Sequence, residues 1–214
     1  VDGWWVEAGA NGVLPLDDRT TELFGMAPRP GTPHATDRYV YYPPLSHIPA
    51  DAAPALGARN WTIRFEISSS VADPEGVLYA RGSHNVGHSL FLKEGKLQFD
   101  YNALGQHTRA AFAAPLGPGE HVIEARFDRA GRSDGTLVLA LDGHDLGETP
   151  IPVVVRMLGS TGVDIGCDRL STVVDDYRGP FPFSGEIHRA EFLIRTPRDR
   201  TDVAAIARHE LARE

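Results

Sequence analysis

The sequence has little that could cross-link the chain or embed it in a membrane. Its 214 residues include one cysteine, Cys167, so no internal disulfide can form. No apolar run approaches the roughly 20 residues that span a bilayer, and no signal peptide is visible. Lysine occurs only at positions 93 and 96, and the net charge is −8. Nucleic-acid and anionic-membrane binders need a concentrated basic face, so the composition argues against both partners.

Helical patterns are also scarce, and two-residue alternation dominates. In the stretch 61–68, apolar side chains alternate with polar ones, which is typical of a half-buried antiparallel strand. Glu94-Gly95 and Asp142-Gly143 predict tight hairpin turns. A hydrophobic content of 42% can supply the core of one large sandwich. Further strands are expected at 38–42, 76–82, 88–93, 96–102, 107–113, 119–128, 137–141 and 145–147. Around a dozen short strands indicate an all-β sandwich or jelly roll.

The chain divides into three expected parts. Residues 1–36 are expected to be a linker and the end of a preceding domain, because proline and glycine are dense before residue 37. The sandwich is expected at 37–197. A C-terminal helix is expected at 198–214, since Val203, Ile206, Ala207 and Leu211 fall on one helical face after a capping Asp199 or Thr201.

The beginning of the chain suggests a fragment of a longer protein. It opens on Val1 rather than methionine, and Trp4 and Trp5 resemble the last turn of an upstream element. Exposed adjacent tryptophans form an apolar patch that invites association. We therefore expect an interface with a missing domain, or a dimer, through four residues of this segment: Trp4, Trp5, Leu14 and Leu16.

The last strand of the expected sandwich carries a distinctive motif. Phe183, Gly185 and Ile187 have the form Phe-x-Gly-x-Ile and are followed by the alternating apolar residues Ala190, Phe192 and Ile194. The glycine permits a close backbone approach or a bulge, and the aromatic residue can plug the end of the core. This motif resembles the last core strand of laminin-G-like and concanavalin-A-like sandwiches, and therefore implies that fold.

Several stretches together resemble the C-terminal domain of a group of large bacterial arylsulfatases. They are Asn11 to Arg19, Ser89 to Leu97, Leu141 to Gly143, Asp175 to Tyr177 and the Phe-x-Gly-x-Ile motif, in the same order and spacing. Such enzymes hydrolyse sulfate esters in an N-terminal domain with a formylglycine and a divalent metal. The formylglycine motif Cys/Ser-x-Pro/Ala-x-Arg is absent here, because Cys167 is followed by Asp168, Arg169, Leu170 and Ser171. The resemblance thus implies a non-catalytic domain without a cofactor, which packs on a sulfatase catalytic domain.

No catalytic constellation emerges from the residues themselves. His84 and His88 have a spacing that could hold a metal, but no cysteine or carboxylate lies beside them, so we interpret both as hydrogen-bonded loop histidines. Glu186 and Glu191 are five residues apart, which places them on opposite faces of a regular strand and disfavours glycoside hydrolysis. Ser171 and Ser184 lack a Gly-x-Ser-x-Gly elbow.

Four aspartates near the end of the sandwich leave two interpretations open. Calcium prefers several carboxylate and carbonyl oxygens supplied by loops, so the cluster could hold a calcium ion at the rim. Alternatively, the carboxylates are solvated or form turns, with an aspartate–arginine pair fixing the loop and Tyr177 capping the core. The residues are Asp164, Asp168, Asp175 and Asp176.

Three functions remain in order of preference. The first is the non-catalytic sulfatase domain, which could shape substrate access. The second is a carbohydrate-binding, laminin-G-like module that stacks sugar rings on exposed aromatics such as Tyr101 or Tyr177. The third is a free-standing jelly-roll hydrolase, for which no acid–base pair can be named. The visible sequence favours the cytoplasm, although a signal in the parent protein would not be seen.

Overall fold

The computed structural model describes residues 37–195, apart from 51, 58, 131–133 and 156–160, together with residues 3, 6, 7 and 10. The chain divides into two compact units, 1–36 and 37–214, and the described strands belong to the second. The predicted C-terminal helix lies outside the described residues. The same holds for Trp4, Trp5, Leu14 and Leu16, so their predicted interface stays a prediction.

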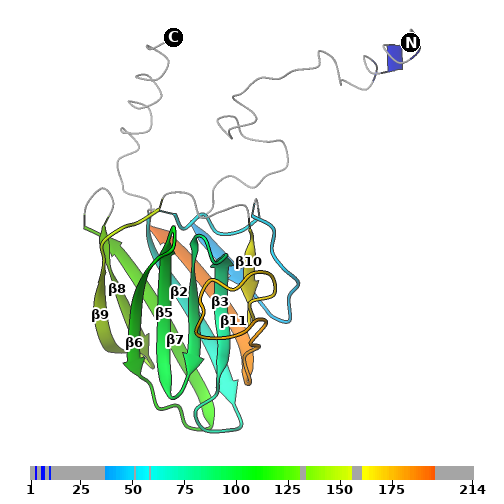
Figure 1. Cartoon of the computed structure of the whole chain (residues 1–214). Helices are drawn as coiled ribbons and strands as arrows, with labels where there is room; N and C mark the ends of the chain where they lie inside the picture. The colour runs from blue at the N-terminus through cyan, green and yellow to red at the C-terminus, as the bar shows by residue number, and fades with distance from the viewer. Residues whose placement is uncertain are drawn as a thin grey trace. The chain divides into compact units, whose positions relative to one another are not determined.

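The second unit is an antiparallel sandwich of two sheets (Figure 1). One sheet has six strands in the order β1-β11-β2-β7-β8-β9, and the other has five in the order β10-β3-β4-β5-β6. The described strands are β1 (Arg38–Tyr41), β2 (Asn60–Ser69), β3 (Gly76–Gly82), β4 (Gly87–Lys93), β5 (Lys96–Ala103), β6 (Gln106–Ala113), β7 (Gly119–Arg129), β8 (Gly135–Leu141), β9 (His144–Ile151), β10 (Val163–Ile165) and β11 (Glu186–Arg195). The predicted all-β sandwich is therefore confirmed.

Both predicted hairpin turns are present. Glu94 and Gly95 have φ of 54° and 66°, and Asp142 and Gly143 have φ of 50° and 79°. Positive φ at both central residues gives the turn whose twist matches that of the flanking strands. A third turn of the same kind joins β5 to β6 at Leu104 and Gly105, with φ of 55° and 85°. Local sequence did not predict this turn, because leucine is uncommon at positive φ.

The main core fills the space between the sheets. On β2, the inward residues Trp61, Ile63, Phe65 and Ile67 are all at most 2% exposed, as their alternation predicted. Trp61 stacks on Phe127 of β7, with ring centroids 5.5 Å apart. Burying one such large apolar side chain contributes about 1.5–3 kcal/mol to stability. Burial of the inward residues of β2 therefore stabilises the packing of the two sheets.

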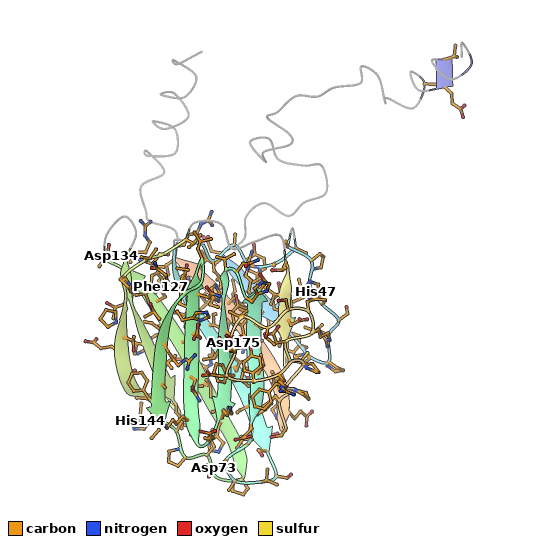
Figure 2. All side chains as sticks on the ribbon, viewed as in Figure 1. His47, Asp73, Phe127, Asp134, His144 and Asp175 are labelled. Carbon is orange, nitrogen blue, oxygen red and sulfur yellow. The ribbon has the colours of Figure 1, made fainter. Side chains whose placement is uncertain are left out.

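The loop between β10 and β11, residues 166–185, covers part of the outer face of the five-stranded sheet. We call it the outer loop; it crosses in front of β3 and β4, and Asp175 on it lies over the sheet (Figures 1 and 2). A second apolar cluster holds it there, formed by Val77, Ala80, Phe91, Val173, Val174 and Tyr177, with Phe181 packed against them. The outward side chains of β5 are buried, whereas β6 is largely exposed, and the candidate site lies at that boundary.

The Phe-x-Gly-x-Ile motif closes the sandwich in the way its residues suggested. A Cβ atom on Gly185 would lie 2.4 Å from the carbonyl oxygen of Ser68, so only glycine fits this approach. Phe183 packs against the main core. Gly76 is equally constrained, because its Cβ would lie 2.3 Å from the Cα atom of Phe183. The two glycines let the end of the outer loop lie directly on the strands.

Candidate functional site

The outer face of β5 and β6 carries a compact group of hydrogen-bonded charged residues. We call it the polar shelf and define it as Asp100 of β5, His107 and Arg109 of β6, and Asp176 of the outer loop. Asp100 and Arg109 are directly opposite each other in the strand pairing. The inward neighbours Phe99 and Tyr101 are core residues, so the alternation of β5 turns Asp100 outward.

Asp100 is the fixed centre of the polar shelf. Its side chain is 0% exposed and accepts hydrogen bonds from three nitrogens. The Nδ1 atom of His107 lies 2.7 Å from Oδ1, and Nε and Nη2 of Arg109 lie 3.1 and 3.0 Å from Oδ2. A buried carboxylate is stable only when it is paired and hydrogen-bonded, so Asp100 fixes both basic side chains.

Arg109 also bridges the sheet to the outer loop. Its Nη1 atom lies 2.6 Å from Oδ2 of Asp176, whose side chain is 29% exposed. Lys93 of β4 donates to the backbone carbonyl of Asp176 at 2.6 Å. An aspartate–arginine pair, which was one interpretation of the stretch Asp175 to Arg178, therefore exists, but its arginine is Arg109 of β6 rather than a residue of that stretch.

The polar shelf keeps hydrogen-bonding groups available to a ligand. A carboxylate only accepts hydrogen bonds, so the Nδ1 atom of His107 carries a hydrogen and Nε2 is left without a partner among the described residues. The side chains of His107 and Arg109 are 33% and 40% exposed. Arg109 has five N–H hydrogens, of which three serve Asp100 and Asp176. The donors of His107 and Arg109 therefore lie beside a partly exposed carboxylate acceptor, Asp176, which is the pattern that hydroxyl groups require.

Buried hydrogen bonds anchor the outer loop beside the polar shelf. The Tyr177 hydroxyl donates to Oδ2 of Asp168 at 2.8 Å and lies 2.8 Å from the Ser89 hydroxyl of β4. Burial raises the pKa of Asp168, against the opposing hydrogen bonds from Tyr177 and the Val173 backbone. Asn102 of β5 donates to the carbonyls of His84 and Val173 at 2.8 and 3.3 Å. The loop is thus held in place on both sides of Asp176.

The four aspartates considered for calcium take separate partners. Asp164 pairs with Arg169 at 2.9 Å and His47 at 3.1 Å, Asp168 accepts from Tyr177, and Asp176 pairs with Arg109. Asp175 is exposed. Within the described part of the chain, no three histidine, cysteine or acidic residues are grouped as metal ligands.

The two candidate histidines lie in different environments. His88 is 1% exposed and stacks on Tyr79 inside the sandwich, with ring centroids 5.3 Å apart. His84 is at the surface and lies 2.9 Å from the Ser171 hydroxyl. The interpretation of both as hydrogen-bonded loop histidines is therefore wrong for His88, which alternation on β4 places in the core.

Glu186 and Glu191 lie on the same face of β11, contrary to the prediction. A bulge between Ile187 and Arg189 changes the alternation of β11, so Glu186 and Glu191 face the same way, opposite Ser68 and Arg64. The prediction of opposite faces is wrong because it assumed a regular strand. Ser68 and Arg64 are four residues apart on β2, a spacing of about 13 Å. Glycosidase carboxylates lie roughly 5–9.5 Å apart, so the pair still does not fit that chemistry.

The predicted sugar-stacking tyrosines are not available. Tyr101 is 3% exposed and Tyr177 is 6% exposed. Tyr101 belongs to the main core, and Tyr177 packs under the outer loop against Phe91, with ring centroids 5.1 Å apart. The prediction that they stack on sugar rings is therefore wrong. Among the described residues, the exposed aromatic side chain is that of Tyr42, at 67%.

Two cavities lie elsewhere on the sandwich. One of about 330 Å³ at the rim is mainly apolar; Phe183, Leu45, Ile187 and Cys167 line it with Arg169. Burial raises the pKa of the Cys167 thiol. The other, of about 440 Å³, lies on the outer face of the six-stranded sheet and is lined mainly by polar residues such as His121, Asp142 and His188.

Sequence reasoning missed the polar shelf. The sequence hint was that polar side chains occupy every second position of two neighbouring strands: Gln98, Asp100 and Asn102 on β5, and His107 and Arg109 on β6. These residue types are usual on a solvated face, and only the fold shows that the outer loop meets them there.

Comparisons with known proteins find the fold but no family. No protein-family model matches the chain, and no curated protein matches it. The carbohydrate-binding module CBM40 of the Ruminococcus gnavus IT-sialidase, bound to α2,3-sialyllactose, is 15% identical; the match covers 72% of this chain and 86% of that chain, with a TM-score of 0.52. The NanB sialidase of Streptococcus pneumoniae, as its K499G mutant, is 10% identical over 77% of this chain and 27% of that one, with a TM-score of 0.53.

Domains LG4-5 of the mouse laminin α1 chain match at 14% identity, over 74% of this chain and 39% of that chain, with a TM-score of 0.44. Nothing in these matches links the chain to a sulfatase. No helix among the described residues is long and apolar enough to cross a membrane. At these identities the comparisons concern the fold alone, and that fold is a concanavalin-A-like antiparallel sandwich.

Proposed function

We propose that the sandwich is a carbohydrate-binding module and that its ligand binds on the polar shelf. The observation that carries this proposal is the polar shelf, in which buried Asp100 holds the partly exposed His107 and Arg109 beside the partly exposed Asp176. A sugar offers hydroxyls that both donate and accept, and sites that hydrogen-bond a ligand discriminate strongly against molecules that lack matching groups.

The fold supports the same proposal by analogy. The CBM40 domain with which this chain shares its sandwich was solved with a bound sialylated sugar. The basis of affinity proposed here is hydrogen bonding by prepositioned charged groups rather than aromatic stacking, because Tyr101 and Tyr177 are buried. Asp100 prepositions His107 and Arg109, which lowers the entropy lost on binding.

Ligand-observed NMR with a panel of neutral and acidic saccharides, including α2,3-sialyllactose, tests the proposal. Arg109→Met is expected to weaken binding by about tenfold or more, because hydrogen bonds to a charged group are lost. The matched control is Arg126→Met, which removes an arginine that likewise joins two carboxylates, Glu124 and Asp145, on the other sheet. The proposal would be contradicted if no saccharide of the panel bound to the wild-type protein, or if the Arg109 variant bound as tightly as wild type.

A second proposal rests on the stretch Asn11 to Arg19. Its resemblance to the junction between two arylsulfatase domains suggests that the sandwich is the non-catalytic part of such an enzyme. Aryl sulfate hydrolysis compared among this chain, the longer parent and a parent cut before Asn11 tests it. The chain should be inert and the cut parent slow or insoluble; activity in this chain alone would contradict it.

A further inference from the structure

One end of the sandwich interior contains a buried arginine that pairs with no carboxylate in the part of the chain that the structure describes. Arg81 of β3 is 9% exposed, and its Nη1 atom donates to the carbonyl of Pro54. Its Nε atom is closed to solvent and has no hydrogen-bond partner among the described residues. A buried charge without a counter-charge is destabilising, so a negative partner beside this guanidinium would stabilise the fold.

Two further polar atoms without partners lie beside Arg81. They are the hydroxyl of Tyr79 and Nδ1 of His88, and both are closed to solvent. His88 is directly opposite Arg81 in the pairing of β3 with β4. Tyr79 also belongs to the core, and its ring centroid is 5.3 Å from that of His88. The strand register therefore brings three buried polar side chains together, each with an atom that has no hydrogen-bond partner among the described residues.

All three groups can serve as hydrogen-bond donors. A guanidinium has no acceptor. Burial raises the pKa of Tyr79, so the phenol keeps its hydrogen. Burial, helped by the charge of Arg81, lowers the pKa of His88 to about 3, so the imidazole is neutral and one ring nitrogen donates. The aromatic rings of Trp61, Phe99 and Tyr101 that stack on His88 supply no anionic acceptor.

We propose that this end of the sandwich is a binding site for a small monovalent anion such as chloride, held by Arg81 with the Tyr79 hydroxyl and the His88 N–H as further donors. A single charge matches the single guanidinium. A small ion is expected rather than a large one, because the three polar atoms are closed to solvent. The site is separate from the polar shelf, since these side chains point into the core and those of the shelf point outward.

Thermal unfolding of the full chain tests the proposal. The Tm in sodium chloride is compared with the Tm in sodium gluconate at the same ionic strength, since gluconate is too large to enter. Once chloride exceeds its half-saturating concentration, the Tm is expected to rise by about 3–5 °C for each tenfold increase. Arg81→Met should abolish the chloride-specific rise. The control Arg195→Met removes an exposed arginine that pairs with Asp128 at 3.0 Å and should keep the rise.

Equal responses to chloride and gluconate in the wild-type protein would overturn the proposal, because water would then satisfy the same donors. A chloride-specific rise that persists in the Arg81 variant would also overturn it. Should that variant not fold, crystals of the wild-type protein grown in sodium bromide give an independent answer. An anomalous bromide peak within hydrogen-bonding distance of Arg81 is expected, and the absence of a peak there would contradict the site.

Discussion

His121 on β7 is hydrogen-bonded through both of its ring nitrogens. Nδ1 lies 2.8 Å from Oδ2 of Asp142, and Nε2 lies 2.9 Å from the carbonyl of Gly117. Both partners accept, so the imidazole meets both only when it carries two hydrogens. The hydrogen bond with Asp142 accordingly raises the pKa of His121, against the effect of burial. Burial would raise the pKa of Asp142, but the bond with His121 and the Val122 N–H lower it overall.

These opposite shifts define a pH window for stability. The contribution of His121 is fully present below its unfolded pKa of 6.5 and is lost as the pH rises through the higher folded value. The contribution of Asp142 is lost only as the pH falls below 3.8 through its lowered folded value. Urea unfolding of wild type and His121→Gln should therefore show a stability difference at pH 5.5 that shrinks at pH 9. A difference independent of pH would refute this.

The turn between β5 and β6 contains a residue that suits its conformation poorly. Leu104 has φ of 55°, in the left-handed region, and is 77% exposed. The cost of this backbone conformation is therefore not offset by burial of the leucine side chain. Asparagine tolerates this region and is preferred in such turns. Leu104→Asn is expected to raise the free energy of unfolding by about 0.5–1 kcal/mol. Chemical denaturation measures it.

The neighbouring glycine supplies the matched control. Gly105 has φ of 85°, and a Cβ atom there would meet nothing within 4 Å. Gly105→Ala should therefore be destabilising by about 1 kcal/mol through backbone conformation alone. If Leu104→Asn were also destabilising, the left-handed conformation of this turn would be in doubt.

The outer face of the six-stranded sheet carries a row of paired charges. An alternating series of ion pairs, which we call the charge ladder, runs across the outer face from β1 to β9 through Arg38, Glu191, Arg189, Glu66, Arg64, Glu124, Arg126 and Asp145. Each charge in the ladder has an opposite neighbour, and exposed pairs of this kind contribute little individually. The two outer faces of the sandwich therefore differ. One carries the charge ladder, and the other carries the polar shelf and the apolar cluster on which the outer loop packs.

At the scale of the whole molecule, the sandwich has its own core and should fold without the first 36 residues. The compact unit begins at residue 37, where the Asp37 carbonyl accepts from the Ile194 backbone at 2.7 Å. A chain starting at Asp37 is expected to unfold cooperatively, with a free energy of unfolding within about 1 kcal/mol of that of the full chain. Circular dichroism during thermal and urea unfolding measures this. A large loss of stability would instead indicate that residues 1–36 pack on the sandwich.

Local sequence was sufficient for much of the sandwich. The alternation at 61–68, the turns at Glu94-Gly95 and Asp142-Gly143, and the glycine of the closing motif all predicted their structures, because two-residue periodicity and positive φ are properties of a few adjacent residues. The core position of Trp61 followed in the same way.

The tertiary structure decided what periodicity cannot express. Alternation says that a side chain leaves one face of a strand, but not which segment covers that face. Tyr177 is therefore buried because the outer loop packs on the five-stranded sheet. The polar shelf exists because Asp176 of the same loop pairs with Arg109 of β6. The bulge in β11 is likewise seen only in the pairing of β11 with β2, and it reversed the predicted relation of Glu186 and Glu191. The sequence by itself determined the strands and their two faces; contacts between residues far apart in the chain determined which faces are buried and where charged groups converge.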